Sequence, residues 1–350
     1  MSVRNKFIIL FLGLQLGSFA QELQWNAGLN YFFDNTEFAR SSLTKDQTMT
    51  GVHFSPEIGL KWNSAHSVFV GSDLLKISGS QNVIDKVDLF AYYQYNTPKV
   101  LFRAGAFPRT EILSNYSDFF FQDSINYFRP IMQGVFWQVG QNNAYFNLWL
   151  DWNGHQTVVN RETFYVGASG HKRFGFFFTD FQSYMYHYAN VRPSNPTYHV
   201  CDNALAHLSL GVDYSNKEGL DTLLFAVGVL AGYERERGLP DNTNAPLGAV
   251  LRLNVEYRLF GLNNTVYMGD PRMVMYNKYG GDLYWSNPFL RSGSYVESKL
   301  YLKVIHTKEV QARLASNFHF SEGKLMFEQV FTLRASLNNF SKPKKIQLFK

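Results

Sequence analysis

Apolar and polar residues alternate with a period of two along most of this chain, which predicts β-strands that face an apolar phase on one side and water on the other. The alternation is clear in segments 23–33 and 310–319. It is clearest in 249–259, where the apolar positions are Ala249, Leu251, Leu253, Val255, Tyr257 and Leu259. These runs reach about ten residues, as tilted membrane strands do, whereas strands of soluble sandwiches average about 5–6 residues.

Short turns and longer irregular links alternate along the chain. The short turns lie at 63–66, 96–99, 140–143, 171–173, 216–221, 261–264 and 306–309. The longer links are 34–48, 78–85, 109–130, 153–162, 188–203, 235–247 and 270–293. Outer-membrane barrels sort their connections in this way, with short periplasmic turns and longer outer loops.

The sequence therefore predicts an all-β fold, a transmembrane antiparallel up-and-down β-barrel of about sixteen strands. An even strand number places both termini in the periplasm. Because 174–187 and 264–269 are the least regular segments, fourteen or eighteen strands stay open. The expected strands are 23–33, 50–62, 66–77, 86–96, 100–108, 131–139, 144–152, 163–170, 174–187, 204–215, 222–234, 248–259, 264–269, 294–305, 310–320 and 325–337.

The two ends of the chain differ from the barrel segment. Residues 1–20 combine a basic start, a short apolar run and a small-x-small motif ending at Ala20, which predicts a cleaved signal peptide; a retained anchor helix is the alternative. The expected divisions are the signal peptide 1–20, the barrel 21–340 and a basic tail 341–350. Because the first strand starts close to Gln21, we expect no N-terminal plug domain.

Composition narrows the class of protein. Aromatic residues make up 17% of the chain, with 32 Phe and 21 Tyr, as the aromatic belts of a barrel require. The net charge of +5 is spread along the chain, so a nucleic-acid partner is not expected. Cys201 is the single cysteine, which excludes an intramolecular disulfide. We expect no cofactor.

The export signal, the strand rhythm over 23–337 and the loop asymmetry resemble the porin-type outer-membrane barrels of diderm bacteria. The resemblance implies a place in the outer membrane, contact with its lipid, passage of small hydrophilic solutes and a possible homo-oligomer. One departure is the basic tail after Phe340, since such barrels often end on an aromatic residue.

Cationic residues are expected on the lumenal face of the strands. They would give the pore a preference for anions, because fixed charge in a narrow pore biases ion entry. Alternatively, acidic residues on the same face pair with them and brace the wall. The expected pore-lining cations are Arg103, Arg109, Arg252, Arg258, Lys299, Lys303, Arg313 and Arg334. The acidic candidates for pairing are Glu57, Asp88, Asp151, Asp213, Glu256, Glu297 and Glu328.

The link 109–130 resembles in position the third outer loop of porins, which folds into the lumen. Its three consecutive phenylalanines, 119–121, favour packing over exposure to water. We expect the loop to turn inward and to direct Glu111, Asp118 and Asp123 toward the cationic wall. The alternative is a loop packed over the mouth or against a neighbouring subunit.

Catalytic signals are weak. His207, Ser209 and Asp213 share one face of a strand, but the chain has no Gly-x-Ser-x-Gly motif, so we expect no enzyme. The spacing of His187, His199, Cys201 and Asp202 matches no compact metal site.

The sequence thus predicts a passive outer-membrane channel for small hydrophilic solutes, with a preference for anions as one option. The alternative is a closed barrel whose outer loops bind a partner or a surface glycan, through the aromatic residues Tyr276, Tyr279, Tyr284 and Trp285.

Overall fold

A computed structural model describes residues 21–113, 116–141, 143–217, 219–239 and 243–339. The proposed signal peptide and the tail 341–350 lie outside the described residues. The strands are β1 (Glu22–Glu37), β2 (Gln47–Trp62), β3 (His66–Ile77), β4 (Lys86–Asn96), β5 (Val100–Pro108), β6 (Ile131–Gln141), β7 (Ala144–Gly154), β8 (Thr163–Phe174), β9 (Phe177–Tyr188), β10 (Cys201–Asp213), β11 (Thr222–Glu236), β12 (Thr243–Asn244), β13 (Leu247–Tyr257), β14 (Phe260–Gly269), β15 (Ser294–His306), β16 (Val310–Ser321) and β17 (Lys324–Asn338).

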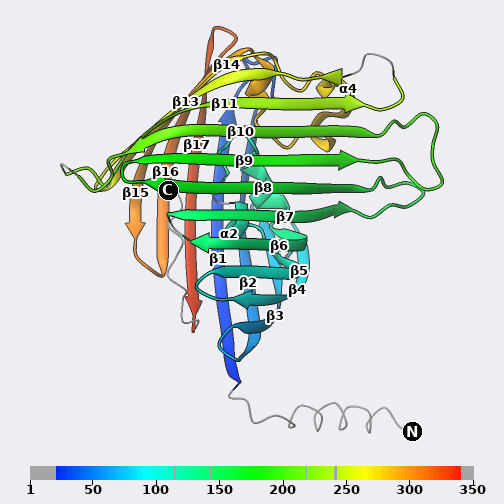
Figure 1. The fold of residues 1–350 in the computed structure, drawn as a ribbon. Helices are drawn as coiled ribbons and strands as arrows, with labels where there is room; N and C mark the ends of the chain where they lie inside the picture. The colour runs from blue at the N-terminus through cyan, green and yellow to red at the C-terminus, as the bar shows by residue number, and fades with distance from the viewer. Residues whose placement is uncertain (1–20, 114–115, 142, 218, 240–242, 340–350) are drawn as a thin grey trace.

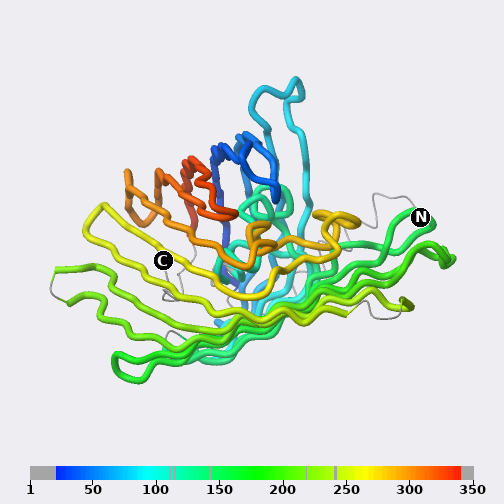
Figure 2. The backbone as a smooth tube through the Cα atoms, turned by 90° about the horizontal axis from the view of Figure 1, so that it is seen from above, coloured from blue at the N-terminus to red at the C-terminus, as the bar shows by residue number. Residues whose placement is uncertain are grey.

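The strands form one closed antiparallel barrel (Figures 1 and 2). Each long strand pairs with its neighbours in the chain, and β1 closes the wall by pairing with β17 from Asn26↔Asn338 to Glu37↔Phe327. The two-residue strand β12 only extends the end of β11, so the wall has sixteen strands. The prediction of a sixteen-stranded outer-membrane barrel is confirmed.

Side chains alternate between the two faces of the wall as predicted. On β10, Leu208 and Leu210 point outward and are 57% and 63% exposed, whereas His207 and Ser209 point inward and are 0% and 2% exposed. The long links mark the outer ends of the strands. The described residues contain no helix of the length and apolarity that a membrane span requires.

Two turns differ from the prediction. Strand β8 continues to Phe174, because the turn is made by Gly175 at φ 64° and not by 171–173. Strand β14 begins at Phe260, since Arg258 at φ 53° makes the turn after β13. The turn predicted at 261–264 was wrong, and Gly261 lies inside β14, where the ring of Tyr301 covers its α-carbon.

Two outer links fold into the barrel. The link 109–130 contains the short helices α2 (Thr110–Leu113) and α3 (Ser124–Phe128). The link 270–293 contains α4 (Tyr276–Tyr279), η1 (Gly280–Asp282) and η2 (Pro288–Arg291). We call these segments the two inward loops. Figure 1 shows α2 and α4 within the outline of the barrel, and both loops contribute to its largest buried cluster.

Candidate functional site

The two inward loops bind each other. The backbone N–H of Gln122 donates to the carbonyl of Trp285 at 2.8 Å, and its side chain donates to the carbonyl of Ser286 at 3.1 Å. The guanidinium of Arg129 lies 4.1 Å from the centre of a Trp285 ring. These contacts join segments more than 150 residues apart in the chain into one plug.

The plug also binds the lumenal wall. Phe119 and Phe120 are 2% and 0% exposed. Glu234 on β11 accepts hydrogen bonds from the backbone of Met273 at 2.7 Å and from the hydroxyl of Tyr284 at 2.8 Å. Burial, followed by the charge of Glu234, raises the pKa of Tyr284 above its ordinary value, so this hydroxyl stays neutral and donates.

Two of the four aromatic residues considered for an adhesive surface are buried in the plug. Tyr284 and Trp285 are 1% and 7% exposed and lie inside the barrel. Tyr276 and Tyr279 pack against the same buried cluster. Tyr284 and Trp285 therefore stabilise the plug, whereas Tyr276 and Tyr279 are half-buried beside it.

Most of the expected pore cations lie on the lumenal face beside acceptors or rings. Arg109 pairs with Asp151, Lys303 lies 2.9 Å from Glu256, and Arg252 lies 3.4 Å from Asp180. Arg103 donates to Gln94 at 2.8 Å, and Lys299 lies 2.6 Å from Asp118. The guanidinium of Arg313 lies 3.6 Å from the centre of the Tyr301 ring, and Arg334 lies opposite Gln311 on the neighbouring strand. Arg258 is the exception, because it occupies the turn after β13.

The acidic residues predicted to face the cationic wall from link 109–130 lie in different surroundings. Asp118 pairs with Lys299, and Asp123 lines a polar lumenal pocket of about 110 Å³ together with Asp34, Glu328 and Lys299. One oxygen of the buried Asp34 carboxyl has no hydrogen-bond partner among the described residues. The side chain of Glu111 lies outside the described part of the structure.

The three residues considered for catalysis do not form a triad. Within the described chain, neither ring nitrogen of His207 has a hydrogen-bond partner. Ser209 accepts a hydrogen bond from Arg252 at 3.2 Å. Asp213 pairs with Arg173 at 2.8 Å near the periplasmic end of the wall.

A row of polar and aromatic side chains crosses the outer ends of five neighbouring strands on the lipid-facing side. We call this the rim row. Its members are direct cross-strand partners: Trp152 on β7, Phe164 on β8, His187 on β9, Asp202 on β10 and Arg235 on β11. The rings of Trp152 and Phe164 stack at 4.9 Å, and Phe164 lies 4.9 Å from the ring of His187. Aromatic residues belong at this level of a membrane wall.

The imidazole of His187 and the carboxylate of Asp202 lie within hydrogen-bonding distance of each other at the centre of the rim row. Nδ1 of His187 lies 3.1 Å from Oδ1 of Asp202. Arg237 holds the same carboxylate with two hydrogen bonds, from Nε at 2.7 Å and from Nη2 at 2.9 Å. The side chain of Asp202 is 8% exposed, and that of His187 is 18% exposed. Asp202 is therefore fixed and charged, while His187 keeps access to its surroundings.

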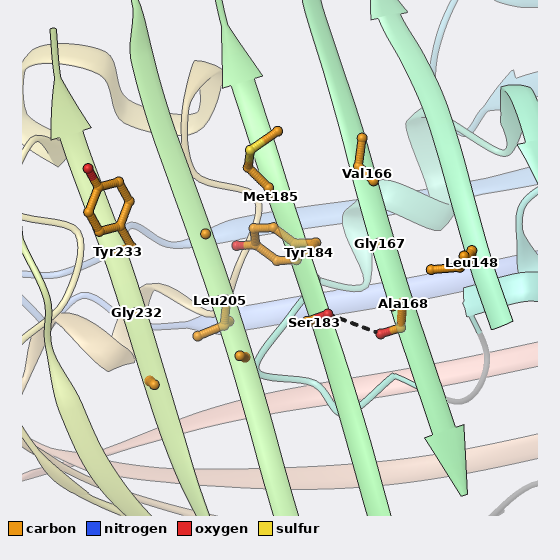
Figure 3. A pocket seen from close by; sticks show the side chains of 13 residues that line it. Leu148, Val166, Gly167, Ala168, Ser183, Tyr184, Met185, Leu205, Gly232 and Tyr233 are labelled. Atoms are coloured by element: carbon orange, nitrogen blue, oxygen red, sulfur yellow. Dashed lines mark hydrogen bonds between the residues drawn. The ribbon is translucent and has the colours of Figure 1, made fainter. Parts of the chain in front are cut away.

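An apolar groove of about 380 Å³ lies on the same face, directly toward the membrane interior from the rim row. Figure 3 shows Met185 and Tyr233 on either side of its upper part. Between them lies Ala204, two residues after Asp202 on β10. The floor is a cross-strand row of small residues, namely Ala168, Ser183, Ala206 and Ala231.

From the sequence, His187 and Asp202 were considered only as metal ligands around a loop, so their pairing was not predicted. A signal was present, because His187 is the polar end of an alternating series on β9 that includes Phe177, Phe181 and Met185. A polar residue at the outer end of a lipid-facing series is a site candidate. Among the described residues, no group of three His, Cys, Asp or Glu side chains is arranged to hold a metal ion.

Solved structures with a similar fold are outer-membrane proteins. OmpT of Vibrio cholerae with loop L8 deleted is 10% identical at a TM-score of 0.54, covering 91% of this chain and 100% of its own. The anion-selective porin of Comamonas acidovorans is 8% identical at 0.53, covering 91% and 99%. OmpF of Salmonella typhi, in complex with daunomycin, is 10% identical at 0.51, covering 91% and 97%. At such identities the likeness establishes the fold alone.

A family model gives a different indication of activity. The model described as lipid A 3'-O-deacylase-type matches residues 17–344, which is most of the chain. No curated protein matches the chain in sequence. The family match overturns the prediction that the protein is not an enzyme. That prediction rested on His207, Ser209 and Asp213, which lie away from the rim row.

Proposed function

The chain belongs to the lipid A 3'-O-deacylase-type family, and from this premise we propose that it hydrolyses an ester-linked acyl chain of an outer-leaflet glycolipid at the rim row. One observation carries the proposal: a histidine oriented by a fixed carboxylate faces the lipid at the outer end of the wall. Lipid esters lie at this depth, between the sugar headgroup and the hydrocarbon. The cations Arg235 and Arg237 beside the pair suit an anionic headgroup.

The chemistry follows from the hydrogen-bond directions. With Asp202 accepting from Nδ1–H, the lone pair of His187 is on Nε2. Nε2 takes a proton from a water molecule while the water oxygen bonds to the ester carbonyl carbon. The bond between that carbon and the sugar oxygen then breaks, and the imidazolium returns the proton to the sugar oxygen. The products are a fatty acid and a sugar hydroxyl.

Accessibility favours the rim row over the lumenal pocket. The pocket also contains a histidine, His319, whose Nε2 lies 3.3 Å from Glu328 and whose Nδ1 lies 2.7 Å from the hydroxyl of Tyr295. His319 is 4% exposed and lies inside the wall. A membrane glycolipid meets the rim row by diffusing within its leaflet, whereas the pocket requires it to enter the barrel.

The test is release of fatty acid from a lipid A-type glycolipid in vesicles that contain the folded protein. We expect the wild-type protein to release the ester-linked chain, and Ser209→Ala to release it at the same rate, because Ser209 lies on the lumenal face. Mass spectrometry of the glycolipid measures both. An intact glycolipid after incubation with the wild-type protein would refute the proposal, and loss of activity in Ser209→Ala would move the site into the lumen.

A second candidate function is diffusion of small solutes, favoured by the charged lumenal residues on the periplasmic side of the plug, such as Lys303 and Glu256. The two inward loops stand in its path. Deleting 112–126 is therefore expected to raise single-channel conductance in planar bilayers several-fold over the wild-type protein, because the phenylalanines 119–121 leave the lumen. Equal conductance before and after the deletion would argue against a constriction made by this loop.

A further inference from the structure

The groove begins next to the rim row, because Met185, Ala204 and Tyr233 line it and each lies two residues along its strand from a member of the rim row. On β10 it extends over Ala204 and Ala206, and its floor crosses from β8 to β11. Bulky outward residues close it on the membrane side, where Phe181 pairs with Leu208 and Leu208 with Val229. The space between the rim row and these residues is therefore open along small side chains.

We infer that this groove is the acyl-chain subsite, and that Ala204 and Ala206 set the length of chain that is accepted; the inference rests on the proposed function. The groove faces the hydrocarbon, so an acyl chain is the chemistry that matches its walls. Its outer end opens beside Arg235 and Arg237, which fit the anionic headgroup attached to such a chain.

The geometry sets the depth of the subsite. Four residues separate Asp202 from Ala206 on one strand, which corresponds to about 13 Å at the rise of an extended strand. A tetradecanoyl chain whose ester lies at His187 reaches the floor of the groove, and a hexanoyl chain ends before it. A large residue at Ala206 therefore obstructs the long chain and leaves the short one unobstructed.

The experiment compares glycolipids that differ only in carrying a hexanoyl or a tetradecanoyl ester, hydrolysed in vesicles by the full-length protein. We expect Ala206→Phe to lower the ratio of kcat/KM for the long chain over the short chain about tenfold or more. Ser183→Leu, in the same cross-strand row, should lower it in the same direction. Ala249→Phe is the matched control, because Ala249 is also outward-facing but lies on β13 outside the groove.

The outcomes separate the two proposals. If the wild-type protein hydrolyses both substrates and the ratio is unchanged in Ala206→Phe and Ser183→Leu, the subsite inference falls and the proposed function stands. If the wild-type protein hydrolyses neither, both fall together. If Ala206→Phe changes the migration of the native oligomer and leaves the ratio unaltered, the groove is a contact between copies of this chain and the inference is overturned. Heat-modifiable gel migration verifies that each variant folds.

Discussion

Replacing His187 by asparagine is expected to lower the rate of ester hydrolysis by about 10²–10⁴-fold, the usual contribution of a general base. Asparagine keeps a hydrogen bond to Asp202 and a similar volume, so the wall is preserved while proton transfer is lost. The measurement is the initial rate of fatty-acid release in vesicles. Asp202→Asn should cause a smaller loss in the same assay, because it removes the group that orients the imidazole.

The chain supplies a matched control for this experiment. His171 and Asp180 form the same pair, with Nδ1 2.7 Å from Oδ1, on neighbouring strands of the same wall, but both face the lumen. His171→Asn should therefore retain the wild-type rate. Full activity in His187→Asn together with inactivity in His319→Ala would show that hydrolysis takes place in the lumenal pocket and not at the rim row.

Replacing Arg109 by methionine is expected to destabilise the folded barrel by about 3–5 kcal/mol, because it leaves the buried charge of Asp151 without its cation. Both side chains are 1% exposed. Arg109 also donates from Nε to the carbonyl of Arg129 at 2.7 Å, and so it fastens both ends of link 109–130. Urea unfolding in lipid vesicles, followed by tryptophan fluorescence, gives the free energy of unfolding.

The comparison is with Arg173→Met. Arg173 pairs with Asp213 at 2.8 Å, but its side chain is 34% exposed, so its loss should cost at most about 1 kcal/mol. The double variant Arg109→Met with Asp151→Leu should recover part of the loss, since it removes the unpaired charge. Equal stability of the Arg109 and Arg173 variants would contradict the role assigned to the buried pair.

The barrel was predictable because a lipid-facing wall imposes its pattern on every strand. Alternation in segments such as 249–259, together with the order of short and long links, was sufficient for the strand number. The turns were less predictable. Arg258 adopts a positive φ in a turn that its charged side chain does not signal, and Gly261 looked like a turn residue although it lies under a tyrosine ring.

The site was less predictable than the fold because it depends on register. His187 and Asp202 are separated by an irregular link and become neighbours only when β9 and β10 pair in one register out of several. The second inward loop was missed for a related reason. Tyr284 and Trp285 are compatible with either display or burial, and only contacts such as those with Glu234 and Gln122 decide between them.

The position of the rim row on the outside of the wall has a kinetic consequence. Under the proposed function, a glycolipid substrate is dissolved in a two-dimensional fluid, so turnover should follow its surface density in the leaflet and not its amount per volume of buffer. The released fatty acid can leave sideways into the same leaflet without crossing water. Saturation curves for this protein are therefore meaningful when substrate is expressed as a mole fraction of total lipid.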